Sequence, residues 1–469
     1  MKRYERVAAA LQQRMDHGLY RTGDRLPSIR ELCAEFAVSV STVQTAYAEL
    51  ESAGLVEARP KSGYFMQARR RHGLLPAPSR PAQRPLDVSQ WDEVLALVNQ
   101  AEHEAGLRLG SGSPDLTAVT LKPLRRELSA LYRRNEPALD NYDTLAGSLA
   151  LRRQLARLAG AAGTSLHEDD IVITSGCQES LSIAIRTLTT PGDVVAVDSP
   201  SFYGSMQTLK AHGLKALELP TDPRSGISLQ ALELALEQWP IKAIQLTATN
   251  NNPLGFTMPD ERKQALVRLA QRFDVAIIED DVYGDLAYTG PRPRTIKSWD
   301  EDGRVMLCSG FSKTLMPSLR LGWIAPGRYR EQALHMKFVS TGATATVPQL
   351  AVARFIERGG YERHLRQAVR LYQRNLAVIL GWIQSLFPAD IAVSCPQGGF
   401  VLWIELQGVD CVKLNARLQR NGIQIAPGVV FSASGKYRDC LRINLVRADA
   451  EVKAALQRMA QEVDQLRSR

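Results

Sequence analysis

A lysine preceded by a serine and followed seven residues later by an arginine occurs in the segment GFSKTLMPSLRLGW, residues 310–323. Lys313 comes just after a predicted strand, and its amine is suited to form a Schiff base with the aldehyde of pyridoxal phosphate. Ser312 and Arg320 are then candidates to hold the phosphate, Arg320 through two parallel hydrogen bonds. Most Ser-Lys pairs are solvated surface residues, so this interpretation depends on four other segments.

The segment ITSGCQESLSIAI, residues 173–185, has the pattern of a strand, a glycine turn and the start of a helix. Gly176, Cys177 and Gln178 lie at the predicted helix start, where backbone N–H groups are able to cradle a phosphate. On its own, the pattern equally fits an ordinary turn between a strand and a helix.

Two segments carry polar groups that suit a pyridine ring. In IIEDDVYGDL, residues 277–286, Asp280 ends an apolar strand and is a candidate partner for the protonated ring nitrogen, while Tyr283 is a candidate donor to the phenolic oxygen of the ring. In TNNNPLGF, residues 249–256, Asn252 is the candidate to share that oxygen. Taken singly, the first segment also fits a solvated turn and the second a simple turn.

An arginine lies inside the apolar strand CLRINLV, residues 440–446. A buried guanidinium needs a planar anion, and the carboxylate of an amino acid fits Arg442. A neighbouring acid of the protein would serve equally well.

Helical patterns alternate with short β-rich runs from about residue 91 to residue 469. This alternation predicts βαβ units, and hence an α/β domain with a mainly parallel sheet covered on both faces. The predicted strands are residues 170–174, 193–198, 242–248, 275–280 and 304–309.

The first 67 residues have a different pattern. An amphipathic helix is predicted over residues 4–17, and Ser28 with Glu31 forms a capping box for a second helix that ends near residue 36. A third helix follows a short turn, with Ser39 or Ser41 as its cap. Two helices joined in this way have the spacing of a helix-turn-helix, and the following strand, turn and strand form a predicted wing. The same pattern also fits a small helical subdomain without a role in DNA binding.

Charge and proline content separate the start of the chain from the rest. Residues 1–85 hold 14 basic and 8 acidic residues, a net charge of +6 out of +9 for the whole chain, which favours a polyanionic partner for this part. Residues 68–90 combine arginines with prolines and have the composition of an extended, semi-rigid linker. The predicted regions are therefore residues 1–67, the linker 68–90 and a body of residues 91–469.

Composition excludes several other classes of protein. The chain is 45% hydrophobic and 23% charged, as in folded globular domains rather than disordered or collagenous chains. No stretch approaches the ~20 apolar residues of a membrane span, and the first residues lack the apolar core of a signal peptide. The six cysteines include no C-x-x-C pair, so we expect reduced thiols in a cytoplasmic protein, with no disulfide framework and no metal site.

The N-terminal segments resemble a known regulator family. Three patterns cover nearly all of residues 4–66 and resemble the winged helix of the GntR family. They are G-x-Y-R-x-G-D-R-L-P-S-x-R-x-L, S-x-S-T-V-x-x-A-Y-x-x-L-x-x-x-G-L-V and R-P-K-S-G-Y-F. Val40 stands where that family usually has Arg or Lys, which removes a phosphate or guanine contact and leaves a side chain able to meet a thymine methyl group. The resemblance implies that the DNA-facing residues are Arg30, Ser39, Ser41, Thr42, Gln44, Lys61, Ser62 and Gly63.

The body resembles fold-type I aminotransferases of class I/II over roughly residues 105–450, because S-G-C-Q, N-P-x-G, D-D-x-Y, S-K-x6-R and L-R-I-N occur in that order. The resemblance implies a large subdomain of about residues 125–340 and a small subdomain built from the flanking segments. It implies that Tyr142 reaches the phosphate in a partner subunit's site and that Phe202, or else Tyr203, stacks on the cofactor ring. Three residues depart from the family pattern: Gly310 for Ser or Thr, Leu254 for Thr and Cys177 for Ser.

A winged helix, a linker and an aminotransferase-like body in one chain resemble the MocR-type regulators. The resemblance implies a cytoplasmic homodimer that binds DNA, carries pyridoxal 5'-phosphate on Lys313, and responds to an amino acid or amine that forms an external aldimine with the cofactor. Two other functions stay open. The chain has the residues for half-transamination and so could be a working aminotransferase with an appended DNA-binding head, or it could sense pyridoxal phosphate itself.

Overall fold

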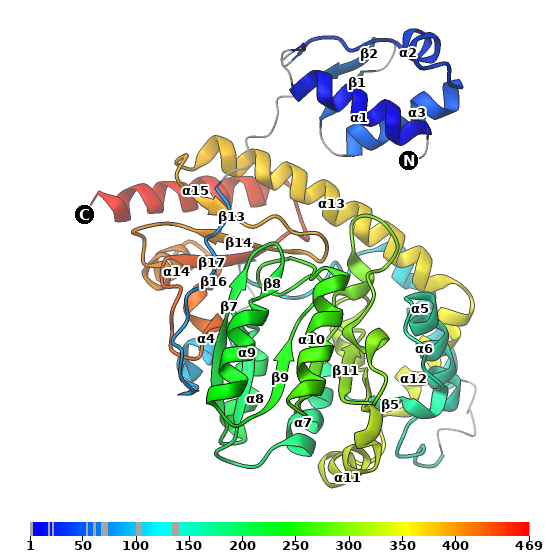
Figure 1. Ribbon diagram of the computed structural model, residues 1–469, viewed down its shortest axis with the longest axis vertical. Helices are drawn as coiled ribbons and strands as arrows, with labels where there is room; N and C mark the ends of the chain where they lie inside the picture. The colour runs from blue at the N-terminus through cyan, green and yellow to red at the C-terminus, as the bar shows by residue number, and fades with distance from the viewer. Residues whose placement is uncertain are drawn as a thin grey trace. The chain divides into compact units, whose positions relative to one another are not determined.

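The computed structural model describes residues 3–16, 19–20, 23–52, 55–59, 62–66, 74–99, 106–133 and 140–468. They belong to two compact units, Met1–Gly73 and Leu74–Arg469, which are described separately (Figure 1). Among these residues, no helix combines the length and the apolar character needed to cross a membrane.

The N-terminal unit is a winged helix-turn-helix, as predicted. Ser28 accepts a hydrogen bond from the backbone of Glu31 and the Glu31 carboxylate accepts one from Ser28 N, so the predicted capping box is present. The wing is an antiparallel pair of strands whose Tyr64 ring stacks on Tyr47, with 3.9 Å between ring centroids. The elements are α1 (Arg3–Asp16), α2 (Ile29–Phe36), α3 (Val40–Ser52), β1 (Val56–Arg59) and β2 (Gly63–Met66).

The body is built around a mixed sheet in the order β3-β7-β6-β9-β10-β11-β12-β5, with β8 paired to β7. The central strands β7, β6, β9, β10 and β11 are parallel, and β12 is antiparallel to both of its neighbours. All five predicted strands are confirmed. The strands are β3 (Leu86–Asp87), β5 (Val172–Thr174), β6 (Val194–Ser199), β7 (Lys215–Asp222), β8 (Gly226–Ile227), β9 (Ile241–Leu246), β10 (Ala276–Asp280), β11 (Val305–Gly310) and β12 (Gly322–Ala325).

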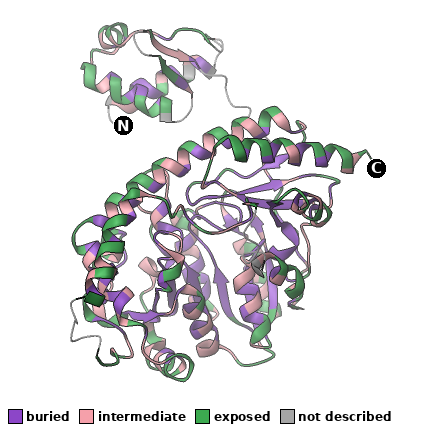
Figure 2. Cartoon of the chain, turned by 180° about the vertical axis from the view of Figure 1, so that it is seen from behind, coloured by how far each residue is buried: buried purple, intermediate pink, exposed green. Residues whose placement is uncertain are grey.

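Helices cover both faces of this sheet, because successive strand residues point to opposite sides. Ile277 packs with α9 and α10 on one face, whereas Ile278 packs with α7, α8 and α11 on the other. Strands β6, β10, β11 and β12 are accordingly buried along their whole length (Figure 2). The helices are α4 (Trp91–Asn99), α5 (Lys122–Arg133), α6 (Leu149–Ala161), α7 (Cys177–Leu188), α8 (Tyr203–Ala211), α9 (Leu229–Gln238), α10 (Asp260–Arg272), α11 (Arg330–Ser340) and α12 (Thr346–Glu357).

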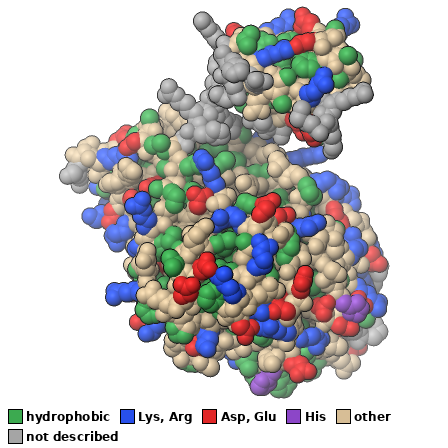
Figure 3. Space-filling model, viewed as in Figure 1, with side chains coloured by type: hydrophobic (Ala, Val, Ile, Leu, Met, Phe, Trp, Pro, Cys, Tyr) green, Lys and Arg blue, Asp and Glu red, His purple; other side chains and the backbone are tan. Residues whose placement is uncertain are grey.

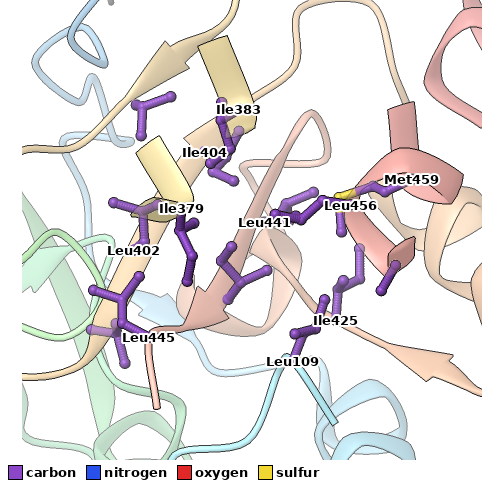
Figure 4. Close-up of a cluster of buried hydrophobic side chains, with 14 of the residues drawn as sticks. Leu109, Ile379, Ile383, Leu402, Ile404, Ile425, Leu441, Leu445, Leu456 and Met459 are labelled. Atoms are coloured by element: carbon purple, nitrogen blue, oxygen red, sulfur yellow. The ribbon is translucent and has the colours of Figure 1, made fainter. Parts of the chain in front are cut away.

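A second, smaller sheet in the order β13-β14-β17-β16 lies under the last helices of the chain. Ile379 and Ile383 of α13 and Leu456 and Met459 of α15 meet the apolar side chains of β14 and β17, such as Leu441 (Figure 4). A parallel pair of strands, β4 with β15, joins the segment between β3 and β5 to this part of the body. The elements are α13 (Gly360–Leu386), α14 (Cys411–Gln419), α15 (Ala450–Arg467), β4 (Leu107–Arg108), β13 (Ala392–Val393), β14 (Val401–Glu405), β15 (Ile423–Gln424), β16 (Ala426–Pro427) and β17 (Cys440–Asn444).

The predicted linker packs on the body from residue 74 onward. Leu74 O accepts a hydrogen bond from Val393 N, Ser79 exchanges two hydrogen bonds with Thr221, and β3 pairs with β7. The segment is therefore extended, as its prolines predict, but it is fixed by backbone hydrogen bonds that composition does not reveal. Residues 68–73 lie outside the described residues.

Candidate functional site

A pocket at the carboxyl ends of the parallel strands brings together most of the predicted cofactor residues, the place where open α/β sheets bind ligands. The pocket is also lined by three residues that were not predicted, Leu181, Thr247 and Val282. Thr247 directly follows β9, and this position at a strand end is the sequence signal that could have identified it. The predicted residues that line it are Cys177, Gln178, Phe202, Asn252, Asp280, Tyr283, Ser312, Lys313 and Arg320.

The Lys313 amine points into this pocket and donates to the carbonyl of Gly112 over 2.9 Å. Burial, and after it the positive charge of Arg442, lowers the pKa of Lys313 to about 8. A substantial fraction of the amine is thus unprotonated near neutral pH, the form that attacks an aldehyde.

The rate at which the apoprotein takes up pyridoxal phosphate covalently is expected to rise with pH and to level off above pH 8. The reason is that only the neutral amine of Lys313 reacts, and its pKa is about 8. Stopped-flow absorbance from pH 6 to 10 measures this rate, with a lysine-containing peptide as control. A rate that keeps rising through pH 10, as it does for the peptide, would contradict the lowered pKa.

Three consecutive acids at the end of β10 have three different environments. The Asp280 carboxylate faces the pocket with Cys177 Sγ 3.7 Å away, and burial raises the pKa of Asp280 to about 6. Asp281 forms an ion pair with Arg292, and Glu279 accepts hydrogen bonds from backbone N–H groups. Of the three, only Asp280 lines the pocket, and with a pKa of about 6 it is mostly ionised at pH 7.

Tyr283 provides a direct test of whether the pocket fits the predicted cofactor. Its hydroxyl is buried and has no hydrogen-bond partner among the described residues, although the side chain lines the pocket. A buried hydroxyl without a partner is costly. The phenolic oxygen of pyridoxal phosphate would accept the missing hydrogen bond, so the residues present fit this group.

The segment around Gly176 is shaped for a phosphate. Gly176 has a φ of 94° and precedes α7, so the first N–H groups of this helix, from Cys177 and Gln178, open toward the pocket. A Cβ at Gly176 would lie 2.7 Å from Nη2 of Arg320, so a larger residue would displace this guanidinium, and the positive φ also favours glycine. A Cβ at Gly310 would lie 3.1 Å from Leu321 O and 3.3 Å from Cys177 N, so a larger residue there would require its neighbours to shift.

Arg442 is buried beside the pocket and has no acidic partner among the described residues. Nη1 donates to Asn252 Oδ1 over 2.9 Å and Nη2 to the carbonyl of Gly110 over 2.6 Å, while Nε has no partner. The ring of Phe431 lies 5.1 Å from the guanidinium carbon. The sequence allowed Arg442 to pair either with a ligand carboxylate or with an acid of the protein. The described residues provide no such acid.

Two aromatic predictions have different outcomes. Phe202 lines the pocket, whereas its neighbour Tyr203 packs edge-on against Phe431, with 5.8 Å between centroids. Tyr142 is 96% exposed and does not line the pocket of its own chain. Its role in a partner subunit's site stays a prediction.

The predicted DNA-facing residues lie on exposed parts of the N-terminal unit. Ser39 precedes α3, and its Oγ accepts a hydrogen bond from Thr42 N, which identifies Ser39 rather than Ser41 as the cap. Arg30, Ser41 and Gln44 are exposed on α2 and α3. Ser62 lies in the turn of the wing and Gly63 begins its second strand, while Lys61 lies outside the described residues. Over the rest of the visible surface, basic and acidic side chains are interspersed (Figure 3).

Comparison with known families decides what these two units are. Residues 3–66 match the model of the bacterial regulatory proteins of the gntR family, and residues 104–459 match aminotransferase class I and II. The chain belongs to the MocR-type regulators of the GntR family. Its fold class is confirmed, and pyridoxal phosphate is the cofactor of its aminotransferase fold.

Individual relatives of this MocR-type chain agree with that assignment. It is 51% identical to the HTH-type transcriptional regulator YjiR of Escherichia coli K12 over 445 residues, 95% of each chain. It is 29% identical to TauR of Rhodobacter capsulatus over 88% of this chain and 86% of TauR. Kynurenine aminotransferase of Pyrococcus horikoshii, solved in complex with PMP, shares 28% identity with a TM-score of 0.73, over 80% of this chain and 94% of that one.

Proposed function

We propose that this protein regulates transcription by binding DNA through its winged helices and an amino acid through its pyridoxal phosphate pocket, as a homodimer in the cytoplasm. The observation that carries the proposal is Arg442, a buried guanidinium beside the pocket with carbonyl partners but no acid among the described residues. Such a group favours a carboxylate ligand, which would form two parallel hydrogen bonds with the guanidinium.

The chain's own residues divide the work in the pocket. When bound, pyridoxal phosphate supplies an aldehyde that condenses with primary amines and a ring that withdraws electrons. Lys313 provides the amine that holds it, and Asp280 provides a negative charge at the pocket wall. Tyr283 donates from its hydroxyl. The phosphate would be held by the start of α7 with Ser312 and Arg320, and by Tyr142 of a second subunit.

A working aminotransferase is the second candidate, because Lys313, Asp280, Tyr283 and Arg442 occur together around one pocket. Steady turnover of amino acid in the presence of a keto acid would support it. A DNA affinity that follows the concentration of pyridoxal phosphate alone would instead support a sensor of the cofactor. Such a sensor would not need Arg442 to bind a carboxylate.

The structure suggests a route from the pocket to the linker. Phe431, against which Arg442 stacks, accepts a hydrogen bond from Ser201 N, next to Phe202 of the pocket. Residues 432–437 follow directly, and they hold the linker: Ala433 O accepts from Ser89 N and Ser89 Oγ, and Lys436 donates to Arg80 O. A ligand that moves the Arg442 side chain would shift Phe431, and with it residues 432–437, to which the linker is attached.

Buried hydrogen bonds brace this segment. The hydroxyl of Tyr437 lies 2.6 Å from Ser199 Oγ, and Ser199 in turn donates to the buried Glu218. Ser432 also donates to Glu218. The Glu218 carboxylate thus joins Ser199, at the end of β6, to residues 432–437, which hold the linker.

Tyr437→Phe is expected to leave amino acid binding within about twofold of wild type while reducing the response of DNA affinity to that ligand. The substitution removes the hydrogen bond between Tyr437 and Ser199, one of those that join the two segments, at a cost of about 1 kcal/mol, or fivefold in the coupling. DNA anisotropy with and without ligand measures the response. An unchanged response would refute this route.

DNA binding itself should be steeply salt-dependent. We expect the affinity of the full-length protein for its promoter DNA to fall about 10³-fold or more between 50 and 200 mM salt, because neutralised phosphates release counterions. Filter binding at several salt concentrations measures this, with random duplex DNA as control. Binding that is insensitive to salt and no tighter than to random DNA would refute specific regulation.

A further inference from the structure

The first turns of α3 expose an unusual row of side chains. Val40, Gln44 and Ala48 are four residues apart, which places them on one side of the helix, and all three are exposed. The Val40 side chain is apolar and is 52% exposed. Val43, Ala46, Tyr47 and Leu50 of the same helix are buried in the core of the N-terminal unit.

The hydroxyl groups on the same turns are engaged within the protein. Ser39 Oγ lies 2.9 Å from Ser41 Oγ and 2.8 Å from Thr42 Oγ1, and Thr45 Oγ1 donates to the carbonyl of Ser41 over 2.9 Å. These hydroxyls form the helix cap and the first turn. The side-chain amide of Gln44, in contrast, has no hydrogen-bond partner among the described residues.

Gln44 and Val40 are therefore the side chains of this row that are able to contact bases. A glutamine amide forms two hydrogen bonds with N6 and N7 of adenine in the major groove, and an apolar side chain contacts the methyl group of thymine. The row contains no arginine or lysine, the side chains that read guanine most often. Ala48 is small enough to let the helix lie close to the floor of the groove.

We propose that α3 reads A·T base pairs, with Gln44 bound to an adenine and Val40 in contact with a thymine methyl group. The proposal rests on the DNA-binding function proposed above and specifies its partner. Residues four apart are about 6 Å apart along a helix axis, and stacked bases are 3.4 Å apart, so the two contacts fall within two base-pair steps of each other. Each half-site should therefore contain a short A·T core.

The experiment begins with selection of binding sites from a random duplex library by the full-length protein loaded with pyridoxal phosphate. The selected half-sites are expected to share an A·T core. Each thymine of the core is then replaced by deoxyuridine, which removes only the methyl group, and each adenine by 7-deazaadenine, which removes only N7. For wild type, one uracil substitution should weaken binding about fourfold and one deazaadenine substitution about tenfold.

The variants assign each effect to a side chain. Val40→Ala should bind the thymine and uracil sites equally, and Gln44→Ala should no longer distinguish adenine from deazaadenine. Both side chains are exposed, so neither change disturbs the core. Leu19→Ala, which alters another exposed apolar residue of the same unit, is the matched control and should keep both preferences.

The outcomes separate this proposal from the one on which it rests. A wild-type protein that selects a defined site but tolerates uracil and deazaadenine at every position would overturn base reading by Val40 and Gln44, while its DNA-binding function would stand. A protein that selects no sequence at all would overturn both.

Discussion

Lys313→Ala is expected to lose all covalently held pyridoxal phosphate. Lys313 is the amine in the pocket, and its lowered pKa of about 8 gives it a reactive neutral fraction. Borohydride reduction followed by peptide mass mapping should place the cofactor on Lys313 in the wild type and detect none above background in the variant. Weak, non-covalent binding through Arg320 and the start of α7 should persist.

Two kinds of lysine serve as controls for this experiment. Lys413→Ala, at an exposed position on α14, should keep the full adduct. The buried lysines Lys263 and Lys337 already donate hydrogen bonds, to Arg294 O and Thr344 Oγ1 respectively. An adduct found on either of them in the wild type would show that the cofactor assignment is wrong.

Arg442→Lys should weaken the binding of an amino acid ligand roughly 30- to 150-fold while cofactor binding stays nearly unchanged. Lysine keeps the positive charge but lacks the planar fork, and hydrogen bonds to charged groups contribute about 2–3 kcal/mol. Cofactor binding should be unaffected because the residues proposed to hold it, Lys313, Asp280 and Arg320, line the pocket from other segments. Titration of the cofactor's absorbance with amino acids measures the affinity.

Arg438→Lys is the matched control for Arg442→Lys. Arg438 lies four residues earlier, is exposed and pairs with Asp410 over 2.8 Å, so it should not affect ligand affinity. If Arg442→Lys leaves the titration midpoint where it is in the wild type, the ligand has no carboxylate at this position. An amine effector would then replace the amino acid in the proposal.

Local sequence patterns predicted the helix cap and the strands because these features depend on residues that are close together in the chain. The capping box of Ser28 and Glu31 and the parallel strands were predicted and are present. The order of the motifs also predicted the set of residues around Lys313. In each case one short segment carries both the signal and the structure.

Contacts between distant segments could not be predicted in this way. Gly110 and Gly112 bond to Arg442 and Lys313 from more than 200 residues away, and nothing in their local pattern indicates this. The same holds for Asp281, which resembles Asp280 in sequence but pairs with Arg292. The direction of such a side chain depends on how the strands assemble.

The central claim is that one protein couples ligand binding in the pocket to DNA binding. The most direct measurement is the affinity of the full-length, cofactor-loaded protein for its promoter DNA, by fluorescence anisotropy, without and with a saturating amino acid that alters the cofactor's absorbance. We expect a change of about fivefold or more, and the same factor in ligand affinity when DNA is present, because coupling is reciprocal. An equal DNA affinity with and without the bound amino acid would contradict it.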